Sequence, residues 1–285
     1  MKFYIRFFEN LIVALLTLTS DIGLQDYLTG AIKGQLLSIH PEFRFVDISH
    51  SIAPFNYSQA AYICRNSFWQ FPPHTFHLLL VNLFEVHPNH LLLAYHNDQY
   101  IACADNGLLS IICDGRPQQV VAIPLAKEMA KTTLNLTKVL GENIKALLDG
   151  KPFHLLGKET DDIITMNALQ ATYGDDWLEG QIIHIDHFEN VVINITREVF
   201  EKHRNGRKFR IVFKRDEMIR KISETYADVQ QNDKLALFNS AGYLEIAINK
   251  GNAAGLFGLQ VFKNENQAAF QLSRLFYQKV RILFE

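Results

Sequence analysis

The chain contains 285 residues, 48% of them hydrophobic, with 28 basic and 30 acidic side chains and a formal net charge of -2. Its length and apolar content predict a globular protein with one large or two modest domains. The charge balance gives no whole-chain attraction to nucleic acid or to an anionic membrane, and no apolar run reaches the roughly 18 to 20 residues that span a bilayer. We therefore expect small molecules or further copies of the chain as partners, and neither nucleic acid nor membrane.

The cysteines and the N-terminus indicate a cytoplasmic protein. The chain has an odd number of cysteines, Cys64, Cys103 and Cys113, which lie in apolar surroundings and show no C-x-x-C spacing. This pattern is typical of buried thiols in a reducing compartment. Residues 1–18 imitate a secretory leader only in part, because Glu9 interrupts the apolar run and no A-x-A cleavage site follows. We interpret them as a short leader followed by the first strand.

Strands and helices alternate in the first part of the chain. An apolar strand is predicted over 15–20, apolar side chains recur at helical spacing over 28–39, and a second strand follows over 43–48. A helix over 60–68 and a continuous apolar strand over 76–81 extend the pattern. This alternation predicts a Rossmann-like α/β sandwich.

The organisation changes after residue 157. A hairpin over 91–104 and an amphipathic helix over 136–148 precede an irregular stretch, beyond which short strand-like segments follow one another with little sign of helix. We predict an N-terminal α/β domain over 1–157, a linker over 158–179, and a smaller C-terminal antiparallel β-barrel domain over 180–285. The strands expected in the second domain are 180–195, 209–213, 234–239 and 243–248.

Two carboxylates follow the first strand. Asp21 and Asp26 lie in the turn S-D-I-G-L-Q-D, directly before the first helix. Ligands of open α/β sheets bind at such strand-to-helix turns, where one carboxylate can accept hydrogen bonds from both hydroxyls of a ribose. The alternative is that Asp21 caps the helix that follows, since aspartate is a preferred N-cap residue. Asp21 is the first ligand residue that we predict.

A second polar cluster, I-I-H-I-D-H-F-E-N, spans residues 182–190. Extended backbone would place His184 and Asp186 on one face, a donor pair that suits zinc. No clear third ligand accompanies them, so a polar connection between strands is the preferred interpretation, and no metal site is predicted.

Two turns and a basic stretch complete the candidates. Asn239–Tyr243 and Asn249–Gly255 carry small residues, which would let a flat ligand such as adenine approach the backbone, although they are equally ordinary turns between strands. Lys202–Lys221 holds nine of the 28 lysines and arginines. Because apolar and basic residues alternate in its core, we interpret it as a strand with one solvated face and not as a nucleic-acid surface.

Six short segments occur in the order found in one enzyme family. They are S-D-I-G-L-Q-D, V-D-I-S-H-S-I-A-P, A-D-N-G-L-L, I-D-H-F-E-N-V-V-I-N-I, T-Y-A-D-V and N-S-A-G-Y-L-E-I-A-I-N-K-G-N-A-A. With them the chain resembles the S-adenosylmethionine hydroxide adenosyltransferases, relatives of the fluorinating and chlorinating enzymes. The resemblance implies a homotrimer in which the ligand lies between the first domain of one subunit and the second domain of its neighbour.

The resemblance also implies a ligand and the residues that hold it. S-adenosylmethionine would be the substrate or ligand, with no separate cofactor. Asp21 would bind the ribose hydroxyls, and Phe55 would lie against the sugar. The other residues divide between the two ends of the ligand: Asp26, Asp186 and Ser240 would hold the methionine end, and Tyr226, Asn190 and the backbone at Asn252 and Ala253 would frame the adenine.

The chain departs from the family where water is activated. Hydrolysing members use an Asp, an Arg and a His to activate a water that attacks the ribose C5′. The corresponding positions here are Leu83, His90 or Leu91, and Asn135. His87 and His90 are the candidate catalytic substitutes, because imidazole titrates near neutral pH, and the alternative is that both are solvated loop residues.

Three functions follow from these observations. The first is hydrolysis of S-adenosylmethionine to adenosine and methionine by water attack at C5′. The second is a catalytically inactive sensor that binds S-adenosylmethionine or adenosine with the retained ligand residues. The third is an altered chemistry in which Glu85, His87 or His90 transfers a proton on another adenosyl substrate.

Overall fold

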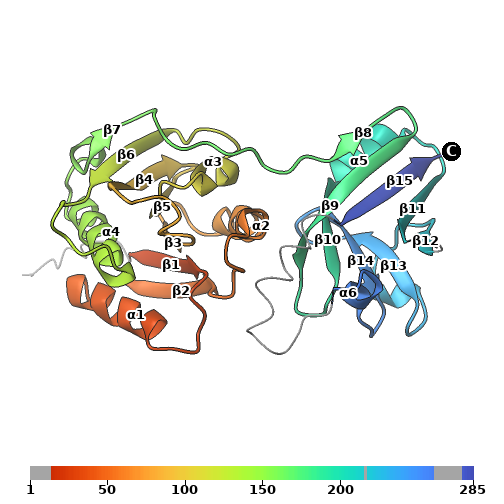
Figure 1. Ribbon diagram of the computed structural model, residues 1–285, viewed down its shortest axis with the longest axis horizontal. Coiled ribbons are helices and arrows are strands. Elements are labelled where there is room, and N and C mark those ends of the chain that lie inside the picture. Colours follow the sequence, from red (N-terminus) through yellow and green to blue (C-terminus); the bar gives the residue numbers. More distant parts are fainter. Residues whose placement is uncertain (1–13, 215–216, 260–277) are drawn as a thin grey trace, which may run out of the picture. The chain divides into compact units, whose positions relative to one another are not determined.

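The chain forms two compact units (Figure 1). The computed structural model describes residues 14–214, 217–259 and 278–285. Unit 1 contains the described residues up to Phe55 and Ile63–Asn167, and unit 2 contains Asn56–Tyr62 and the described residues from Ala168 onward. The leader expected at the N-terminus lies outside the described residues.

Unit 1 is built on a seven-stranded sheet in the order β2-β1-β3-β5-β4-β6-β7. β1, β2, β3 and β5 run parallel, whereas β4 lies antiparallel between β5 and β6, and β7 pairs antiparallel with β6. The central strand β3 is buried along its whole length, as its sequence FHLLL requires. The strands are β1 (Leu15–Ser20), β2 (Arg44–Ser49), β3 (Phe76–Leu80), β4 (His90–His96), β5 (Gln99–Ala104), β6 (Gln119–Pro124) and β7 (Lys158–Glu159).

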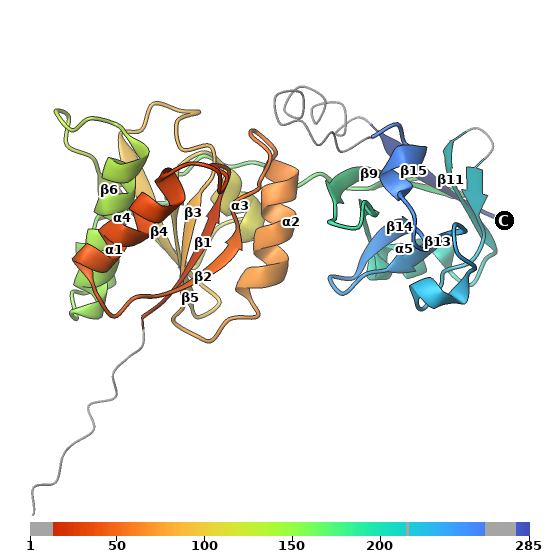
Figure 2. The same ribbon diagram turned by 90° about the horizontal axis from the view of Figure 1, so that it is seen from below.

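Helices cover both faces of this sheet (Figure 2). On one face α1 (Leu28–Ile39) packs beside α4 (Thr133–Leu148), and on the other lie α3 (Leu108–Ile112) and the second half of α2 (Tyr57–Phe68). A short 3-10 helix, η1 (Phe153–Leu155), follows α4. The arrangement confirms the predicted Rossmann-like α/β sandwich.

The contact between α1 and α4 shows why these segments form helices that pack. Ile32 and Leu36 are buried on α1 at a spacing of four residues, and Leu140 and Ile144 are buried on α4 at the same spacing. Gly141 lies where the two helices meet, and a Cβ atom there would come within 2.6 Å of Leu36 Cδ2. The apolar faces of both helices thereby join the core under β1, β3 and β4.

Unit 2 is an antiparallel sheet that curls into a nearly closed barrel. Its strand order is β12-β11-β15-β9-β10-β14-β13, and β8 pairs with β9. The Ser223 N–H donates to the Ala236 carbonyl at 2.8 Å, so the segment after β12 lies against β13. The predicted C-terminal barrel is confirmed. Its strands are β8 (Thr172–Tyr173), β9 (Trp177–Ile185), β10 (Val191–Thr196), β11 (Phe209–Lys214), β12 (Glu217–Ile219), β13 (Lys234–Phe238), β14 (Tyr243–Ile248) and β15 (Lys279–Phe284).

Unit 2 also contains a helix that the sequence pattern did not predict, α5 (Arg197–Arg204). Thr196 caps it by accepting a hydrogen bond from the Val199 N–H, and Phe200 is its single buried residue. One buried side chain in eight residues leaves no apolar period to detect. The shorter helices of this unit are η2 (Tyr226–Asp228) and α6 (Ala253–Leu256).

Over the part of the chain that the structure describes, no helix combines the length and the apolar character needed to cross a membrane.

Candidate functional site

Three parallel strands end side by side at one edge of the unit 1 sheet. β1, β3 and β5 are consecutive neighbours, and Asp21, Asn82 and Asp105 follow them. The antiparallel β4 starts at the same edge, because Leu91 pairs with Ala104. Ligands of open α/β sheets bind outside such carboxyl ends. We use the name carboxyl edge for Asp21, Asn82, His90, Asp105 and Asn106.

The Asp21 carboxylate is held against the neighbouring strand. Its Oδ2 accepts a hydrogen bond from the Asn82 N–H at 2.9 Å. Burial raises the pKa of Asp21, and the bond from Asn82 offsets part of that rise. Asp21 does not cap α1, because that helix starts at Leu28 with Tyr27 as its N-cap residue. Asp21 is therefore a half-buried acceptor in the turn, available for a ligand.

Asp26 lies closer to the helix than Asp21 does. Its Oδ1 accepts a hydrogen bond from the Leu28 N–H at 2.8 Å, and the residue is exposed. The two carboxylates of the predicted turn thus differ, since Asp26 supports the first turn of α1 and Asp21 belongs to the carboxyl edge.

Asn82 organises the carboxyl edge, and sequence reasoning missed it. Its Oδ1 accepts a hydrogen bond from the Phe55 N–H at 3.0 Å, and Asn106 Nδ2 donates to the Asn82 carbonyl at 3.2 Å. Asn82 has a left-handed backbone (φ 49°), which asparagine tolerates better than most residues. Its Nδ2 is buried and has no hydrogen-bond partner among the described residues. The signal in the sequence was a polar residue directly after a strand that is apolar except for His77.

Phe55 lies near this turn but is largely solvent-exposed. Its side chain is 68% exposed and its backbone is left-handed (φ 60°). A bulky residue in that conformation is strained unless its surroundings hold it, and the Asn82 side chain does so through the Phe55 N–H. The aromatic ring is thereby presented to solvent beside the carboxyl edge.

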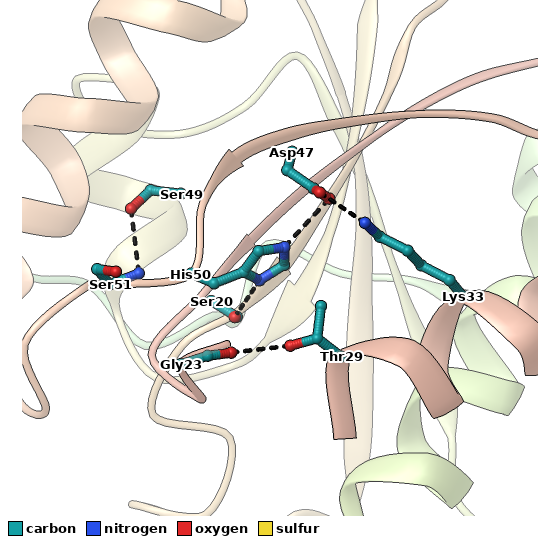
Figure 3. A network of polar contacts seen from close by, with 8 residues as sticks. All are labelled: Ser20, Gly23, Thr29, Lys33, Asp47, Ser49, His50 and Ser51. Carbon is teal, nitrogen blue, oxygen red and sulfur yellow. Dashed lines mark hydrogen bonds and ion pairs between the residues drawn. The ribbon is translucent and has the colours of Figure 1, made fainter. Parts of the chain in front are cut away.

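A polar network joins Ser20, the residue before Asp21, to the end of β2 (Figure 3). His50 Nδ1 lies 2.7 Å from Ser20 Oγ, and His50 Nε2 lies 3.1 Å from Asp47 Oδ1. Lys33 Nζ completes the network at 2.5 Å from Asp47 Oδ2. Burial alone would raise the pKa of Asp47, but the bonds and charges of Lys33 and His50 outweigh burial and lower it.

The network connects Ser20, His50 and Asp47 in the order found in a hydrolytic triad. It is, however, too deeply buried to act as one. Ser20 is completely buried and His50 is 5% exposed, so a substrate cannot reach the hydroxyl. The network instead joins the end of β1 to the end of β2. The Gly23 N–H, which donates to the His50 carbonyl at 2.8 Å, adds a second tie across the same turn.

A cavity of about 100 Å³ lies where β4 begins and β5 ends. Its lining includes Leu83, His87, His90, Asp105, Asn106 and Ile164. His90 Nε2 lies 3.0 Å from Asp105 Oδ2, and Asp105 Oδ1 accepts a hydrogen bond from the Ile164 N–H at 2.9 Å. The structure thus brings together Leu83 and both candidate histidines. Asp105 was missed as a candidate residue, and the available signal was that it follows the second strand of the predicted hairpin over 91–104.

The expected water-activating positions have other roles here. Leu83 is 6% exposed and belongs to the hydrophobic core of unit 1. Asn135 lies in the first turn of α4, where its side chain donates to the Ala130 carbonyl at 2.7 Å, and it does not line the cavity. Leu83, the position at which the resemblance implies an acid, thus forms part of the apolar wall of the cavity.

In unit 2, Asp186 and Asn190 form a closed loop. Asp186 Oδ1 accepts hydrogen bonds from the Asn190 N–H (2.8 Å) and the Phe188 N–H (2.9 Å), and Oδ2 accepts one from Asn190 Nδ2 (3.0 Å). Burial lowers the pKa of the nearby His184. No group of three or more His, Cys, Asp or Glu residues suited to a metal ion occurs among the described residues. The Asp186 carboxylate is thus used to shape its own loop.

Tyr226 contacts a buried acid that sequence reasoning missed. Its hydroxyl donates to Glu245 Oε1 at 2.6 Å, and Glu245 is 3% exposed. Burial raises the pKa of Glu245, and burial together with this acid raises that of Tyr226. Glu245 lies in the segment Y-L-E-I-A-I. The signal that could have identified it was an acid within a predicted strand whose neighbouring residues are apolar.

The last three predicted ligand residues lie in turns of unit 2. Ser240 is exposed between β13 and β14. Asn252 caps α6, because its Oδ1 accepts a hydrogen bond from the Gly255 N–H at 2.6 Å. Ala253 is completely buried at the start of that helix.

Known proteins resemble this chain along most of its length. An (R)-S-adenosyl-L-methionine hydrolase of Methanocaldococcus jannaschii is 25% identical over 257 residues, which is 87% of this chain and 93% of the relative. A protein of the same name from Thermus thermophilus is 24% identical and covers 85% of this chain and 94% of its own.

Solved structures share the fold. An uncharacterised conserved protein of Thermotoga maritima superimposes with a TM-score of 0.77 at 22% identity, covering 94% of this chain and 99% of that one. A conserved hypothetical protein of Thermus thermophilus gives 0.68 at 19% identity, covering 95% and 100%.

Family profiles match both units. Residues 16–157 match the SAM hydroxide adenosyltransferase N-terminal domain, and residues 180–264 match the C-terminal domain of the same family. The two matches occur in the family's order and together cover most of the chain. The chain belongs to the SAM hydroxide adenosyltransferase family.

Proposed function

We propose that this protein binds S-adenosylmethionine and hydrolyses it to adenosine and methionine. The observation that carries the proposal is the Asp21 carboxylate, half-buried at the carboxyl edge and free of any helix-capping role. The relatives named (R)-S-adenosyl-L-methionine hydrolase and the family profiles on both units support the same conclusion.

In this proposal the described residues divide the work of binding. Asp21 accepts the two ribose hydroxyls, and the exposed Phe55 ring covers the sugar. Asp26, Asp186 and Ser240 hold the methionine end, while Tyr226, Asn190 and the backbone at Asn252 and Ala253 frame the adenine. An ionised carboxylate suits the hydroxyls because it offers only acceptors, and two neighbouring hydroxyls offer two donors.

The reaction itself needs little help with the leaving group. The water oxygen bonds to C5′, the bond from C5′ to sulfur breaks, and its electron pair returns to sulfur as methionine leaves. The sulfonium already carries a positive charge, so the protein mainly positions the water and accepts its proton. The cavity beside His90 is the part of the carboxyl edge that offers both space and a titratable group.

The test is a product assay with matched carboxylate variants. Purified protein is incubated with S-adenosylmethionine, and adenosine and methionine are quantified by chromatography. We expect equimolar products, and in Asp21→Ala an affinity for adenosine weakened by about 100-fold, the effect of losing hydrogen bonds to a charged group. Asp162→Ala, which removes an exposed carboxylate of the same unit, should match the wild type. Absence of product in the wild type would refute hydrolysis.

The apolar wall at Leu83 supports a second candidate, a protein that binds the ligand without turning it over. Leucine cannot accept a proton, and Leu83 occupies the position at which the resemblance expects the acid. Calorimetric binding of S-adenosylmethionine without any product would favour this sensor over the hydrolase.

We further propose a homotrimer in a reducing cytoplasm. The predicted ligand residues fall on both units, as expected where different subunits complete one site, and Cys64, Cys103 and Cys113 are free and buried. Light scattering after size-exclusion chromatography tests the assembly, and a monomer with full activity would refute it.

A further inference from the structure

The cavity at the carboxyl edge has room for water next to one histidine. Its volume of about 100 Å³ exceeds the space that a single water needs. Leu83 and Pro88 supply buried apolar wall, and His90 and Asp105 supply the polar part. A water molecule held here would find its hydrogen-bond partners on the His90 side.

The fold brings His90 and Asp105 together by strand register. β4 and β5 form an antiparallel hairpin in which Leu91 pairs with Ala104, so the next residues outward, His90 and Asp105, face each other at the edge. The side chain of Asp105 is 10% exposed, whereas that of His90 is 35% exposed. The carboxylate thus lies deeper in the protein than the imidazole that it contacts.

Both oxygens of Asp105 are engaged. Oδ1 accepts a hydrogen bond from the Ile164 N–H, and Oδ2 lies 3.0 Å from His90 Nε2. An ionised carboxylate only accepts, so the proton of this contact resides on Nε2. His90 Nδ1 then carries the lone pair, and no side chain or backbone group of the described residues bonds to it.

We infer that His90 Nδ1 accepts the proton of the attacking water and that Asp105 is the positioning residue that orients the imidazole and stabilises its charged form. This inference rests on the proposed hydrolysis. As the water oxygen bonds to C5′ and the electron pair of the broken C5′–S bond leaves with methionine, one water proton moves to Nδ1 and from there to solvent. The pair would replace the lost acid with a carboxylate-supported base, an arrangement that recurs in other hydrolytic sites.

His87 does not share this arrangement. It lines the same cavity, but it is exposed, and no described residue makes a hydrogen bond or ion pair with its ring. Asp105 cannot itself be the base without giving up one of its two contacts. Of the titratable groups in the cavity lining, His90 alone combines a fixed ring with a free nitrogen.

The test compares substitutions in the full-length protein by steady-state kinetics. His90→Ala should lower kcat by about 100-fold, the usual size of a general-base contribution, and leave KM for S-adenosylmethionine within about twofold. Added imidazole should restore part of the lost kcat in His90→Ala but not in the wild type. His154→Ala, which removes an exposed histidine of the same unit, is the matched control and should keep full kcat.

Asp105 is tested by a readout that a purely structural role would not move. In Asp105→Asn we expect kcat to fall by at least about tenfold with unchanged adenosine affinity, and the nitrogen NMR shifts of His90 to lose the Nε2–H tautomer. Asp105→Glu should recover part of the rate. Thermal unfolding and adenosine binding of each variant identify any that fail to fold.

Each outcome separates this inference from the proposed function. The inference is overturned if the wild type turns over and His90→Ala keeps the wild-type kcat, or if His87→Ala loses kcat and His90→Ala does not. Either result leaves the proposed hydrolysis standing. Wild-type protein that binds S-adenosylmethionine but forms no adenosine overturns hydrolysis, and the proton transfer falls with it.

Discussion

The sheet of unit 1 holds one histidine in its interior and another at its carboxyl edge, and the two differ in burial and in the number of their hydrogen-bond partners. In the interior, His77 Nδ1 lies 2.7 Å from Thr17 Oγ1, its Nε2 lies 2.6 Å from Gln99 Oε1, and its ring stacks on Phe68. At the edge, the ring of His90 has one polar partner among the described residues, Asp105, and its side chain is 35% exposed beside a cavity.

The difference separates stability from chemistry. Burial lowers the pKa of His77 to about 4, and both of its nitrogens are satisfied, so it stays neutral and cannot exchange a proton without breaking a bond. His90 keeps one nitrogen free where water can enter. Substitution of polar groups sealed within the sheet should therefore change the free energy of unfolding, whereas substitution of those at the carboxyl edge should change the affinity for the ligand. Four substitutions can test this contrast.

The largest expected effect concerns His77. Because its pKa is about 4 in the folded state and 6.5 in the unfolded chain, only the unfolded chain takes up a proton between these values. Its contribution to stability is full above pH 6.5 and is lost as the pH falls toward 4, by about 3 kcal/mol. Urea unfolding should show this pH-dependent loss in the wild type.

The matched variants for this prediction are His77→Leu and His154→Gln. His77→Leu should lose the pH-dependent component and also be destabilised at pH 7, since Thr17 and Gln99 lose their buried partner. His154 is exposed, so its replacement should keep the wild-type pH dependence. The same pH dependence in His77→Leu as in the wild type would contradict the assignment.

The second effect appears in binding. Asp21 accepts ribose hydroxyls best when ionised, and burial raises its pKa, so adenosine affinity should fall as the pH drops through that raised value. Loss of hydrogen bonds to the charged carboxylate corresponds to about 2.7 kcal/mol, the roughly 100-fold weakening expected for Asp21→Ala. Calorimetric titration with adenosine across pH 4 to 7 measures the change. In Asp21→Asn the affinity should be weak and independent of pH, and a parallel pH profile would refute the role of Asp21.

A smaller effect is expected at Ser20, which is buried in the sheet and also lies next to the turn of Asp21. Ser20→Ala removes the bond to His50 and should cost about 1 kcal/mol of unfolding free energy, since it leaves a buried ring nitrogen without that partner. Because the network ties the turn of Asp21, adenosine affinity should weaken several-fold as well. Ser38→Ala, on the exposed face of α1, removes a hydroxyl that bonds only its own helix and should change neither quantity.

The smallest effect is expected at Lys33. Its ion pair with Asp47 is partly exposed, at 29% and 39% of the two side chains, and solvent screens such pairs. Lys33→Ala should therefore destabilise the protein by about 0.5 kcal/mol at low salt and by less at high salt. Urea unfolding at two salt concentrations measures it. A loss comparable with that of His77→Leu would show that the network in Figure 3 is far more cooperative than its exposure indicates.

Sequence patterns predicted the elements that have strong periods. The continuous apolar strand before Asn82 and the helical spacing over 28–39 and 136–148 appear as β3, α1 and α4. The helix α5 escaped prediction because its burial rests on Phe200 alone. A hydrophobic period can be detected only where several side chains share one face of an element. A short element that is held by a single buried side chain is therefore recognised from its packing in the structure and not from its sequence pattern.

The candidate site was predicted unevenly for a related reason. Asp21 could be proposed from the sequence because the end of an α/β strand is a position that sequence can locate. Asn82, Asp105 and Glu245 were missed, since each acts through a partner on a neighbouring strand: Asn82 through Asp21, Asp105 through His90, and Glu245 through Tyr226. Such pairs depend on strand order and register.

The sequence by itself determined the two-part organisation, the carboxylate at the end of the first strand, and the family through six ordered segments. These depend on local spacing, which the chain carries within a few residues. The tertiary structure alone decided that Asp21 does not cap a helix, that the Ser20, His50 and Asp47 network is sealed from substrate, and that Asp105 contacts the ring of His90. Those outcomes depend on burial and on contacts across 15 to 30 or more residues of sequence, which arise only when neighbouring strands pair.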